Sequence, residues 1–203
     1  MRPNIYHLSW KADTVGTPGL IAAVVGGLVV LLLLIWAGST FNKLVRQRNQ
    51  VHAAWAQTDV QLKRRYDLIP NLVETVKGYA AHERTTLEAV TAARTNAMAA
   101  QGGVAERAEA ENALTATLGR LFALSEAYPD LKANQNFLAL QRELAGTEDK
   151  IAYARQFYNS AAQTLNNTVQ SLPSNIIAGL GGFKTAPFFE AAGGERGPVQ
   201  VRF

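Results

Sequence analysis

The apolar positions of this chain follow two patterns: one continuous run near the N-terminus, then a repeating helical spacing. Residues 20–37 read LIAAVVGGLVVLLLLIWA and contain no charged or strongly polar side chain. A helix of this length rises about 27 Å at 1.5 Å per residue, which is close to the thickness of a bilayer's hydrocarbon core. The run therefore predicts a single transmembrane helix over residues 19–38.

A cleaved signal peptide is the main alternative for this run, because Trp36, Ala37 and Gly38 end it with small residues. The run is longer than the apolar core of a signal peptide, and no compact basic segment precedes it. A buried soluble helix is disfavoured because no side of the segment suits water. We interpret the run as an uncleaved anchor, with residues 1–18 as an N-terminal extension.

Beyond the span, residues 41–172 repeat apolar side chains at spacings of three and four, which indicates amphipathic helices. Breaks in this spacing fall at residues 67–70, 102–103 and 128–130, where Asp, Gly and Pro occur. Four helices joined by short breaks pack most simply as an antiparallel bundle with coiled-coil-like contacts. The sequence predicts an all-α fold: a transmembrane helix followed, over residues 39–173, by an antiparallel bundle of four long helices.

The stretch KRRYDLIPNLVETVKGYA, residues 63–80, contains the first of these breaks. Proline disfavours helical conformation at Ile69 and cannot donate a hydrogen bond inside a helix. We therefore predict that the first bundle helix ends near Tyr66. Asp67 would cap the next helix, with Pro70 in its first turn.

A basic cluster, Lys63, Arg64 and Arg65, precedes that proline. Such a cluster can bind phosphates, anionic lipid headgroups or an acidic partner. The aromatic residues nearby do not repeat at a spacing that would stack bases, so we expect no nucleic-acid binding. The first half of the bundle is basic and the second half acidic, so the cluster is alternatively a set of solvated helix ends with internal ion pairs.

The residue types that carry chemistry are scarce. The chain has no cysteine, which excludes disulfides and thiol catalysis. His7, His52 and His82 form neither a Glu-x-x-His pair nor a His-Glu-x-x-His motif, and no glycine-rich phosphate loop is present. We therefore expect a non-enzymatic protein with no catalytic residue, metal, cofactor or small-molecule substrate.

Three charged residues, Asp59, Glu148 and Arg155, lie beside the apolar stripes. Because a buried charge needs a partner, they indicate either ion pairs between helices or side chains whose tips reach solvent. An enzyme whose site forms only between subunits would depend on these residues, an alternative that we consider weak.

The C-terminal tail, residues 174–203, loses the helical charge pattern but stays apolar. Its large apolar residues must cover the bundle, the bilayer surface or another subunit. Candidate interface residues are Ile176, Ile177, Leu180, Phe183, Phe188, Phe189 and Phe203. Packing on the bundle is the simplest interpretation, and self-association is the next.

Self-association has a second source in the span, where Ala22 with Gly26 and Ala23 with Gly27 form small-xxx-small pairs. Such pairs let transmembrane helices approach closely. They predict that membrane lipids and a second copy of this chain are its partners.

Orientation follows from the basic residues that flank the span. Lys43, Arg46 and Arg48 follow it closely, whereas Arg2 and Lys11 precede it. Basic residues favour the cytoplasmic side, so we predict a bacterial inner-membrane protein with its bundle in the cytoplasm.

Long stretches of the chain resemble the LemA family of bacterial membrane proteins. They read FNKLVRQRNQVHAAWAQTDVQLKRRYDLIPNLVETVKGYAAHERTTLEAVTAAR, LGRLFALSEAYPDLKANQNFLALQREL, TEDKIAYARQFYN and SNIIAGLGGFK. The resemblance runs from about residue 41 to the C-terminus. It implies an N-terminal membrane helix and a helical bundle, and it supplies no catalytic residue.

Family members are associated with a membrane-bound metalloprotease and other envelope-maintenance proteins, and a relative serves in magnetosome membranes. From the residues and the resemblance we expect a structural or interaction scaffold that forms homo-oligomers. One alternative is an accessory subunit of a membrane protease or envelope-stress system. Another is a membrane-organising protein that binds anionic lipids.

Overall fold

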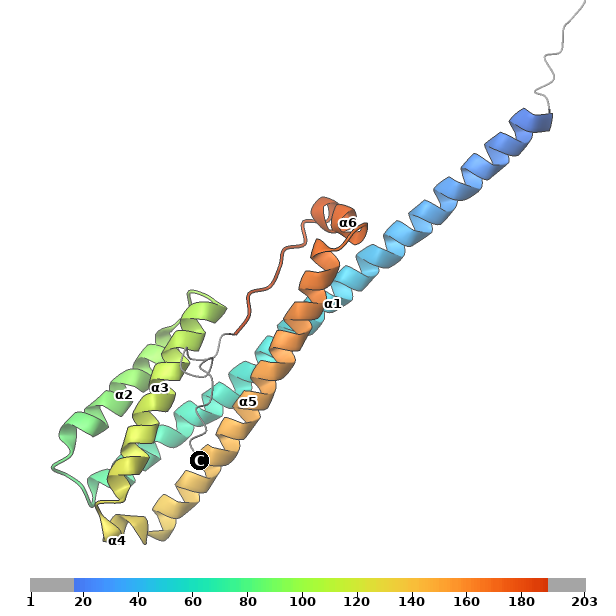
Figure 1. Ribbon diagram of the computed structural model, residues 1–203. Helices are drawn as coiled ribbons and strands as arrows, with labels where there is room; N and C mark the ends of the chain where they lie inside the picture. The colour runs from blue at the N-terminus through green and yellow to red at the C-terminus, as the bar shows by residue number, and fades with distance from the viewer. Residues whose placement is uncertain (1–16, 190–203) are drawn as a thin grey trace, which may run out of the picture.

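One long helix, α1 (Thr17–Lys77), runs from the apolar span to the far end of the bundle (Figure 1). The computed structural model describes residues 17–189. The helices that follow are α2 (Arg84–Ala99), α3 (Val104–Ser125), α4 (Pro129–Lys132), α5 (Gln135–Gln170) and α6 (Ser174–Leu180). No strand occurs within the described residues, and the predicted all-α fold is confirmed.

The apolar part of α1 stands apart from the rest of the molecule (Figure 1). It is long and apolar enough to cross a membrane, and none of its most hydrophobic segment is buried within the chain. The helix crosses the predicted boundary after residue 38 without interruption. The span and the first bundle helix are therefore one element.

The predicted end of a helix near Tyr66 is wrong, because α1 continues through Pro70 to Lys77. Asp67 is consequently an interior helical residue and not a cap. Proline leaves the carbonyl four residues earlier, that of Tyr66, without its helical donor. Arg94 on α2 supplies one, since its Nε donates to this carbonyl at 2.8 Å. A contact from a distant part of the sequence thus offsets the local helix-breaking tendency.

The true first corner lies at residues 78–83, between α1 and α2. The breaks predicted at Gly102–Gly103 and around Pro129 do separate helices. Gly103 has a φ of 118°, a conformation that side chains with a Cβ rarely adopt. Asn134 caps α5, since its side chain accepts from the backbone N–H of Phe137 at 3.0 Å.

The bundle has two parts with different numbers of helices. In the half far from the span, the α2–α3 hairpin packs on the α1–α5 pair (Figure 1). The core of this distal half includes Leu62, Leu72, Val90, Leu114, Leu121, Phe137 and Ile151. The antiparallel four-helix bundle predicted for residues 39–173 therefore exists as such only in the distal half.

Near the span, α1 and α5 form a two-helix stem whose groove the tail fills. The core of this proximal half includes Leu44, Val51, Ala54, Tyr158, Leu165, Ala178, Phe183 and Phe189. Aromatic rings of α1 pack against rings of the tail. The ring centres of Phe41 and Phe183 are 5.4 Å apart, and those of Trp55 and Phe189 are 6.1 Å apart. In the proximal half, the tail thus supplies the apolar contacts that α2 and α3 supply in the distal half.

Two asparagines of α5 hold the tail by its backbone. Asn166 donates to the carbonyl of Ala186 at 2.9 Å and accepts from its N–H at 2.7 Å. Asn159 makes the same pair of bonds with Phe189, at 3.0 and 2.8 Å. A fifth bond runs from the hydroxyl of Tyr158 to the carbonyl of Pro187 at 2.9 Å. We call Asn159 and Asn166 the asparagine clasp.

Candidate functional site: a buried ionic cluster beside a cationic cleft

A buried ionic cluster joins α1, α3 and α5 in the distal half. Arg65 and Glu111 are 1% and 0% exposed, and Arg65 Nη1 lies 3.4 Å from Glu111 Oε2. The hydroxyl of Tyr66 donates to the other oxygen of Glu111. Arg65 also donates to the hydroxyl of Thr115 at 2.7 Å and lies 3.3 Å from the carboxylate of Glu148. Each charge in the cluster therefore has an opposite charge or a hydrogen-bond partner.

Burial governs how this cluster titrates. Loss of solvation raises the pKa of Glu111, and the hydroxyl of Tyr66 and the guanidinium of Arg65 oppose that shift. The phenol of Tyr66 also has a raised pKa, because it is buried and donates to Glu111. Removing one partner of such a cluster is strongly destabilising, because it leaves the other charge or polar group unsatisfied. The cluster thus acts on the structure by fixing which three helices lie together.

The basic cluster at 63–65 does not form one surface. Arg65 is buried, which removes it from the candidate lipid and partner contacts. Arg64 is exposed and pairs with Glu143 on α5 at 2.6 Å, and Lys63 is exposed. All three lie about 38 Å or more along α1 from Gly38, since a helix rises 1.5 Å per residue. Lipid or partner contact by the exposed Lys63 and Arg64 stays a prediction.

Asp59 and Glu148, which lie beside the apolar stripes, form ion pairs between helices. Asp59 on α1 pairs with Arg107 on α3 at 3.5 Å, and Glu148 on α5 pairs with Arg65. Arg155 lies with its guanidinium 4.5 Å from the ring centre of Phe189, so it packs on the tail. The interpretation as cross-helix pairs holds for Asp59 and Glu148.

The sequence interpretation missed Glu111 and the burial of Arg65, although both positions carried a signal. Glu111 lies three residues from Ala108 and from Leu114, in the middle of an apolar stripe. Arg65 lies between Leu62 and Ile69 at the same kind of spacing. A cation and an anion placed within two predicted core stripes would have indicated a buried pair.

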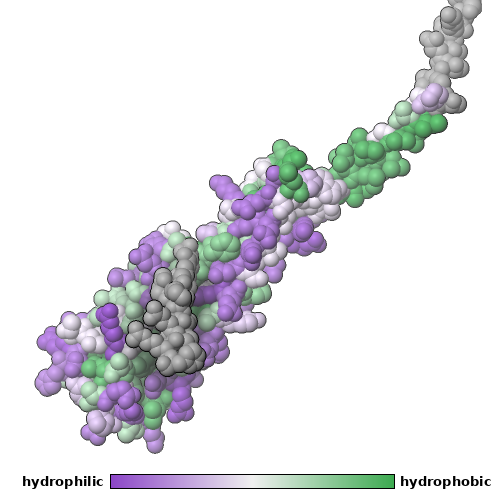
Figure 2. Space-filling model, in the orientation of Figure 1, coloured by the Kyte–Doolittle hydropathy of each residue, from purple (hydrophilic) through white to green (hydrophobic). Residues whose placement is uncertain are grey.

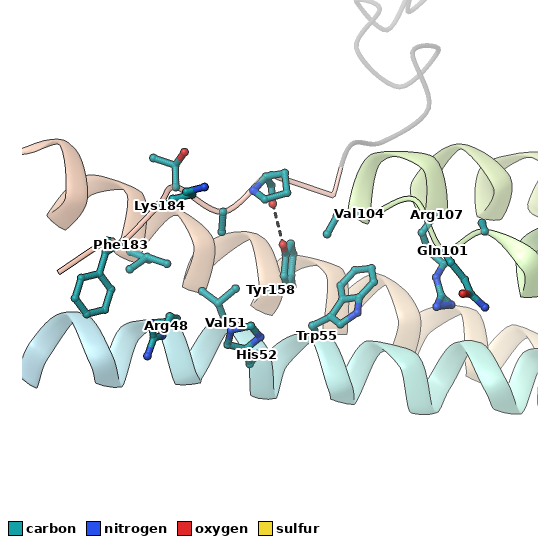
Figure 3. A pocket seen from close by; sticks show the side chains of 17 residues that line it. Arg48, Val51, His52, Trp55, Gln101, Val104, Arg107, Tyr158, Phe183 and Lys184 are labelled. Atoms are coloured by element: carbon teal, nitrogen blue, oxygen red, sulfur yellow. Dashed lines mark hydrogen bonds between the residues drawn. The ribbon is translucent and has the colours of Figure 1, made fainter. Parts of the chain in front are cut away.

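A cleft of about 630 Å³ lies beside the asparagine clasp, between the stem and the α2–α3 turn. Figure 3 shows Arg48, His52 and Trp55 on α1 along one side, with the tail crossing above. Arg107 enters from α3, and its guanidinium lies 5.9 Å from the ring centre of Trp55. Neither Arg65 nor Glu111 lines this cleft, so the ionic cluster and the cleft are separate sites.

Cationic and aromatic groups alternate in the cleft. Arg48 lies 5.1 Å from the ring centre of Phe183, and Lys184 follows on the tail. Burial raises the pKa of Tyr158, which keeps its hydroxyl protonated to donate to the tail. Such a lining suits an anionic group or a peptide that carries one. Within residues 17–189, no group of three or more His, Cys, Asp or Glu side chains is placed to hold a metal ion.

The tail residues that were interface candidates divide into two sets. Phe183 and Phe189 are buried in the proximal core, and Ile177 is partly buried there, so these three are committed to their own chain. Ile176, Leu180 and Phe188 are exposed. Phe203 lies outside the described residues. The tail as far as Phe189 therefore packs on the bundle and leaves part of its apolar surface uncovered.

The small-residue positions of the span, Ala22, Ala23, Gly26 and Gly27, are exposed on α1. Among residues 17–189, nothing apart from the adjoining turns of α1 lies within 4 Å of where a Cβ would stand at Gly26 or Gly27. Close approach of a second helix at these glycines remains a prediction.

The sequence is similar to several proteins from bacteria. Magnetosome proteins MamQ 1 and MamQ 2 of Paramagnetospirillum magneticum are each 27% identical over 175 residues, which cover 74% of this chain and 64% of the relative. Protein LemA of Metamycoplasma hominis is 26% identical over 160 residues, which cover 79% of this chain and 73% of the relative. The matched region thus spans 64% of the MamQ proteins' own length.

The LemA family model matches residues 54–203, which include most of the bundle, the clasp and the tail. This match agrees with the stretches that resembled the family, and the apolar helix agrees with a membrane-associated protein. The chain belongs to the LemA family.

Proposed function

We propose that this protein is a non-enzymatic scaffold, anchored by one membrane span, that self-associates and presents its bundle to partners. The observation that carries the proposal is the continuity of α1, which is both the anchor and a core helix of the bundle. Movement or clustering of the spans is thereby coupled to the position of the bundles. The ionic cluster supports a structural role, since its charges are turned toward one another between three helices.

Exposed apolar side chains on α5 support contact between copies. Tyr153 and Phe157 are four residues apart, on one side of the helix, and are 70% and 40% exposed. Gly26 and Gly27 in the span offer a second surface for close approach. Contacts in the membrane and along α5 would together make a parallel assembly of upright bundles.

The test compares the mass of the full-length protein in mild detergent with that of two variants. We expect an oligomer for the natural chain, and a smaller species when Gly26 and Gly27 are both replaced by Ile. Leu32→Phe is the matched control, because it adds bulk on the opposite side of the span and should leave the mass unchanged. A natural chain that stays monomeric and yields no crosslinks between copies in native membranes would overturn the proposal.

We further propose that the bundle lies in the cytoplasm, at the inner membrane of a bacterial cell. The support is the exposed basic set Lys43, Arg46 and Arg48, which follows the span. The test uses Ala81→Cys, an exposed position in the distal turn of a chain without cysteine. Labelling by an impermeant maleimide only after permeabilisation would support this orientation, and labelling of intact cells would reverse it.

A further inference from the structure

The end of the bundle nearest the span exposes an apolar stripe, which we call the foot. It consists of Leu172, which precedes α6, and of Ile176 and Leu180, four residues apart on α6, and these are 78%, 57% and 84% exposed. The other side of α6 packs inward, with Ala178 only 1% exposed and Ile177 partly buried against the proximal core. The short helix is therefore amphipathic, with an apolar side that nothing in the described chain covers.

The position of α6 places this stripe at the level where the span ends. The tail residue that follows α6, Phe183, packs against Phe41, and an added Cβ at Gly181 would lie 3.1 Å from the same ring. Phe41 is three residues beyond Gly38, a rise of about 4.5 Å along the helix. Figure 2 shows the hydrophobic surface of α6 close to the end of the hydrophobic span that adjoins the bundle. The foot thus lies within the depth of one headgroup layer from the hydrocarbon core.

The charges around the foot match a bilayer surface. Residues 156–183 contain no charged side chain, although α1 alongside is rich in them. Arg48 lies 5.1 Å from the ring centre of Phe183, and the exposed residues Lys43, Arg46 and Lys184 lie in the adjoining segments of α1 and the tail. Cations at that depth attract anionic headgroups, and Trp36 at the end of the span is the kind of residue that favours the interface.

We propose that the foot inserts into the interfacial layer of the bilayer, in the leaflet where the span ends. The occupant is lipid because the stripe continues the apolar surface of α1 at the same depth, and an amphipathic helix there buries its apolar side among headgroups and upper acyl chains. The α6 helix then lies on the membrane and holds the stem against it. This inference does not depend on self-association, which the detergent measurement tests separately.

The experiment uses spin labels on the full-length chain in vesicles of phosphatidylcholine and phosphatidylglycerol. One variant carries the label at Leu180→Cys. The control carries it at Val60→Cys, which is similarly exposed, at 63%, but lies on α1 about 33 Å of helix beyond Gly38. Oxygen concentrates among acyl chains, whereas a water-soluble nickel complex is excluded. We expect the label at position 180 to collide several-fold more with oxygen and several-fold less with nickel than the label at position 60.

Each other outcome overturns the proposal. Equal accessibility at the two positions would mean that the foot faces water. Low nickel accessibility without an increase in oxygen accessibility would mean that protein covers the foot, either a second copy or residues 190–203 of the same chain. Dilution with unlabelled protein would then separate these two, because only contact between copies changes the spin–spin broadening.

A second pair of variants tests the same contact without a label on the foot. Ile176→Asp with Leu180→Asp should abolish insertion, and Val60→Asp, at an exposed apolar position of α1, is the matched control. We expect a fluorophore at Ala81→Cys to approach the bilayer more often when the foot carries Asp, because the bundle is then free to tilt. Unchanged energy transfer to a lipid acceptor, with native helix content in both variants, would overturn the proposal.

Discussion

Two arginines, Arg65 and Arg94, satisfy polar groups that the helices leave open. Arg65 balances Glu111 in the distal core, and Arg94 bonds the carbonyl that Pro70 leaves without a donor. Both act across helices, at sequence separations that local propensity does not register. Arg65 therefore determines the buried ion pair, and Arg94 supports the continuity of α1 through Pro70. The apolar spacing of the sequence shows neither feature.

Replacement of Arg94 by Met should lower the free energy of unfolding by about 1–2 kcal/mol, since the carbonyl of Tyr66 loses its donor. In a Pro70→Ala background the restored N–H bonds that carbonyl, so the same replacement should cost less. Chemical denaturation of the natural chain, the two single variants and the double variant is followed by circular dichroism in detergent. The four free energies of unfolding give the coupling free energy between positions 70 and 94. Equal losses in both backgrounds would show that Arg94 does not act through this carbonyl.

Glu111 should make the stability of the bundle depend on pH. Its pKa is raised on folding above the ordinary 4.5, so the folded state binds this proton more tightly than the unfolded state. This contribution is fully present below about pH 4.5 and is lost as pH rises through the folded pKa. The stability of the natural chain relative to Glu111→Gln should therefore fall with increasing pH.

Melting temperatures of the natural chain and Glu111→Gln between pH 4 and 8 measure this difference. Glu109→Gln, an exposed position on the same helix, is the control and should show a constant offset. A Glu111→Gln offset that is equally constant, or that grows with pH, would contradict the raised pKa.

At the scale of elements, the sequence predicts the helices well and their ends less well. The apolar spacing identified the helical content, and the glycines at 102–103 and Pro129 marked real breaks. The break at Pro70 was wrong because the compensating donor lies on another helix. The two-helix stem could not be predicted either, since it requires knowing how far α2 and α3 extend along the α1–α5 pair.

The asparagine clasp could not be predicted from spacing. Asn159 and Asn166 lie seven residues apart among other uncharged polar residues, and nothing in the sequence separates them from the exposed Asn167. Their role appears only when the tail backbone lies along α5. The cleft depends on the same placement, since the tail forms one of its walls.

Replacement of both clasp asparagines by Ala should release the tail, because four hydrogen bonds to its backbone are lost. We expect limited proteolysis near Lys184 to become faster in this variant, by a factor of about 10 for each 1.4 kcal/mol of lost closure energy. The control variant Asn167→Ala should be cleaved at the same rate as the natural chain. Protection that persists in the double variant would mean that Phe183 and Phe189 hold the tail without the clasp.

At the scale of the whole molecule, α1 makes the described protein elongated, with the α2–α3 hairpin toward the end opposite the apolar span (Figure 1). From Gly38 to Lys77 the helix rises about 59 Å. The cleft lies partway along and the α1–α2 corner at the far end. Partners of the cleft and partners of the distal end would therefore meet the protein at different heights.

Four glycines inserted after Gly38 should uncouple the bundle from the span, because they interrupt the shared helix. We expect energy transfer from a fluorophore at Ala81→Cys to acceptors at the bilayer surface to rise. The same insertion after Gly102, in the exposed turn between α2 and α3, should leave the transfer nearly unchanged. Equal transfer in all three proteins would show that the continuous helix does not set the height of the bundle.

The dependence of the proximal core on the tail has a consequence for synthesis. Phe41 leaves the ribosome early, while its partner Phe183 is among the last described residues to be made. The span can therefore enter the membrane, and the distal half can assemble, while the groove of the stem is still open. A chain whose translation stops before Phe183 would keep an exposed apolar groove beside the bilayer. Exposed apolar surface of this kind makes an incomplete chain prone to aggregation and proteolysis. The groove between α1 and α5 can thus close only after the tail has been synthesised.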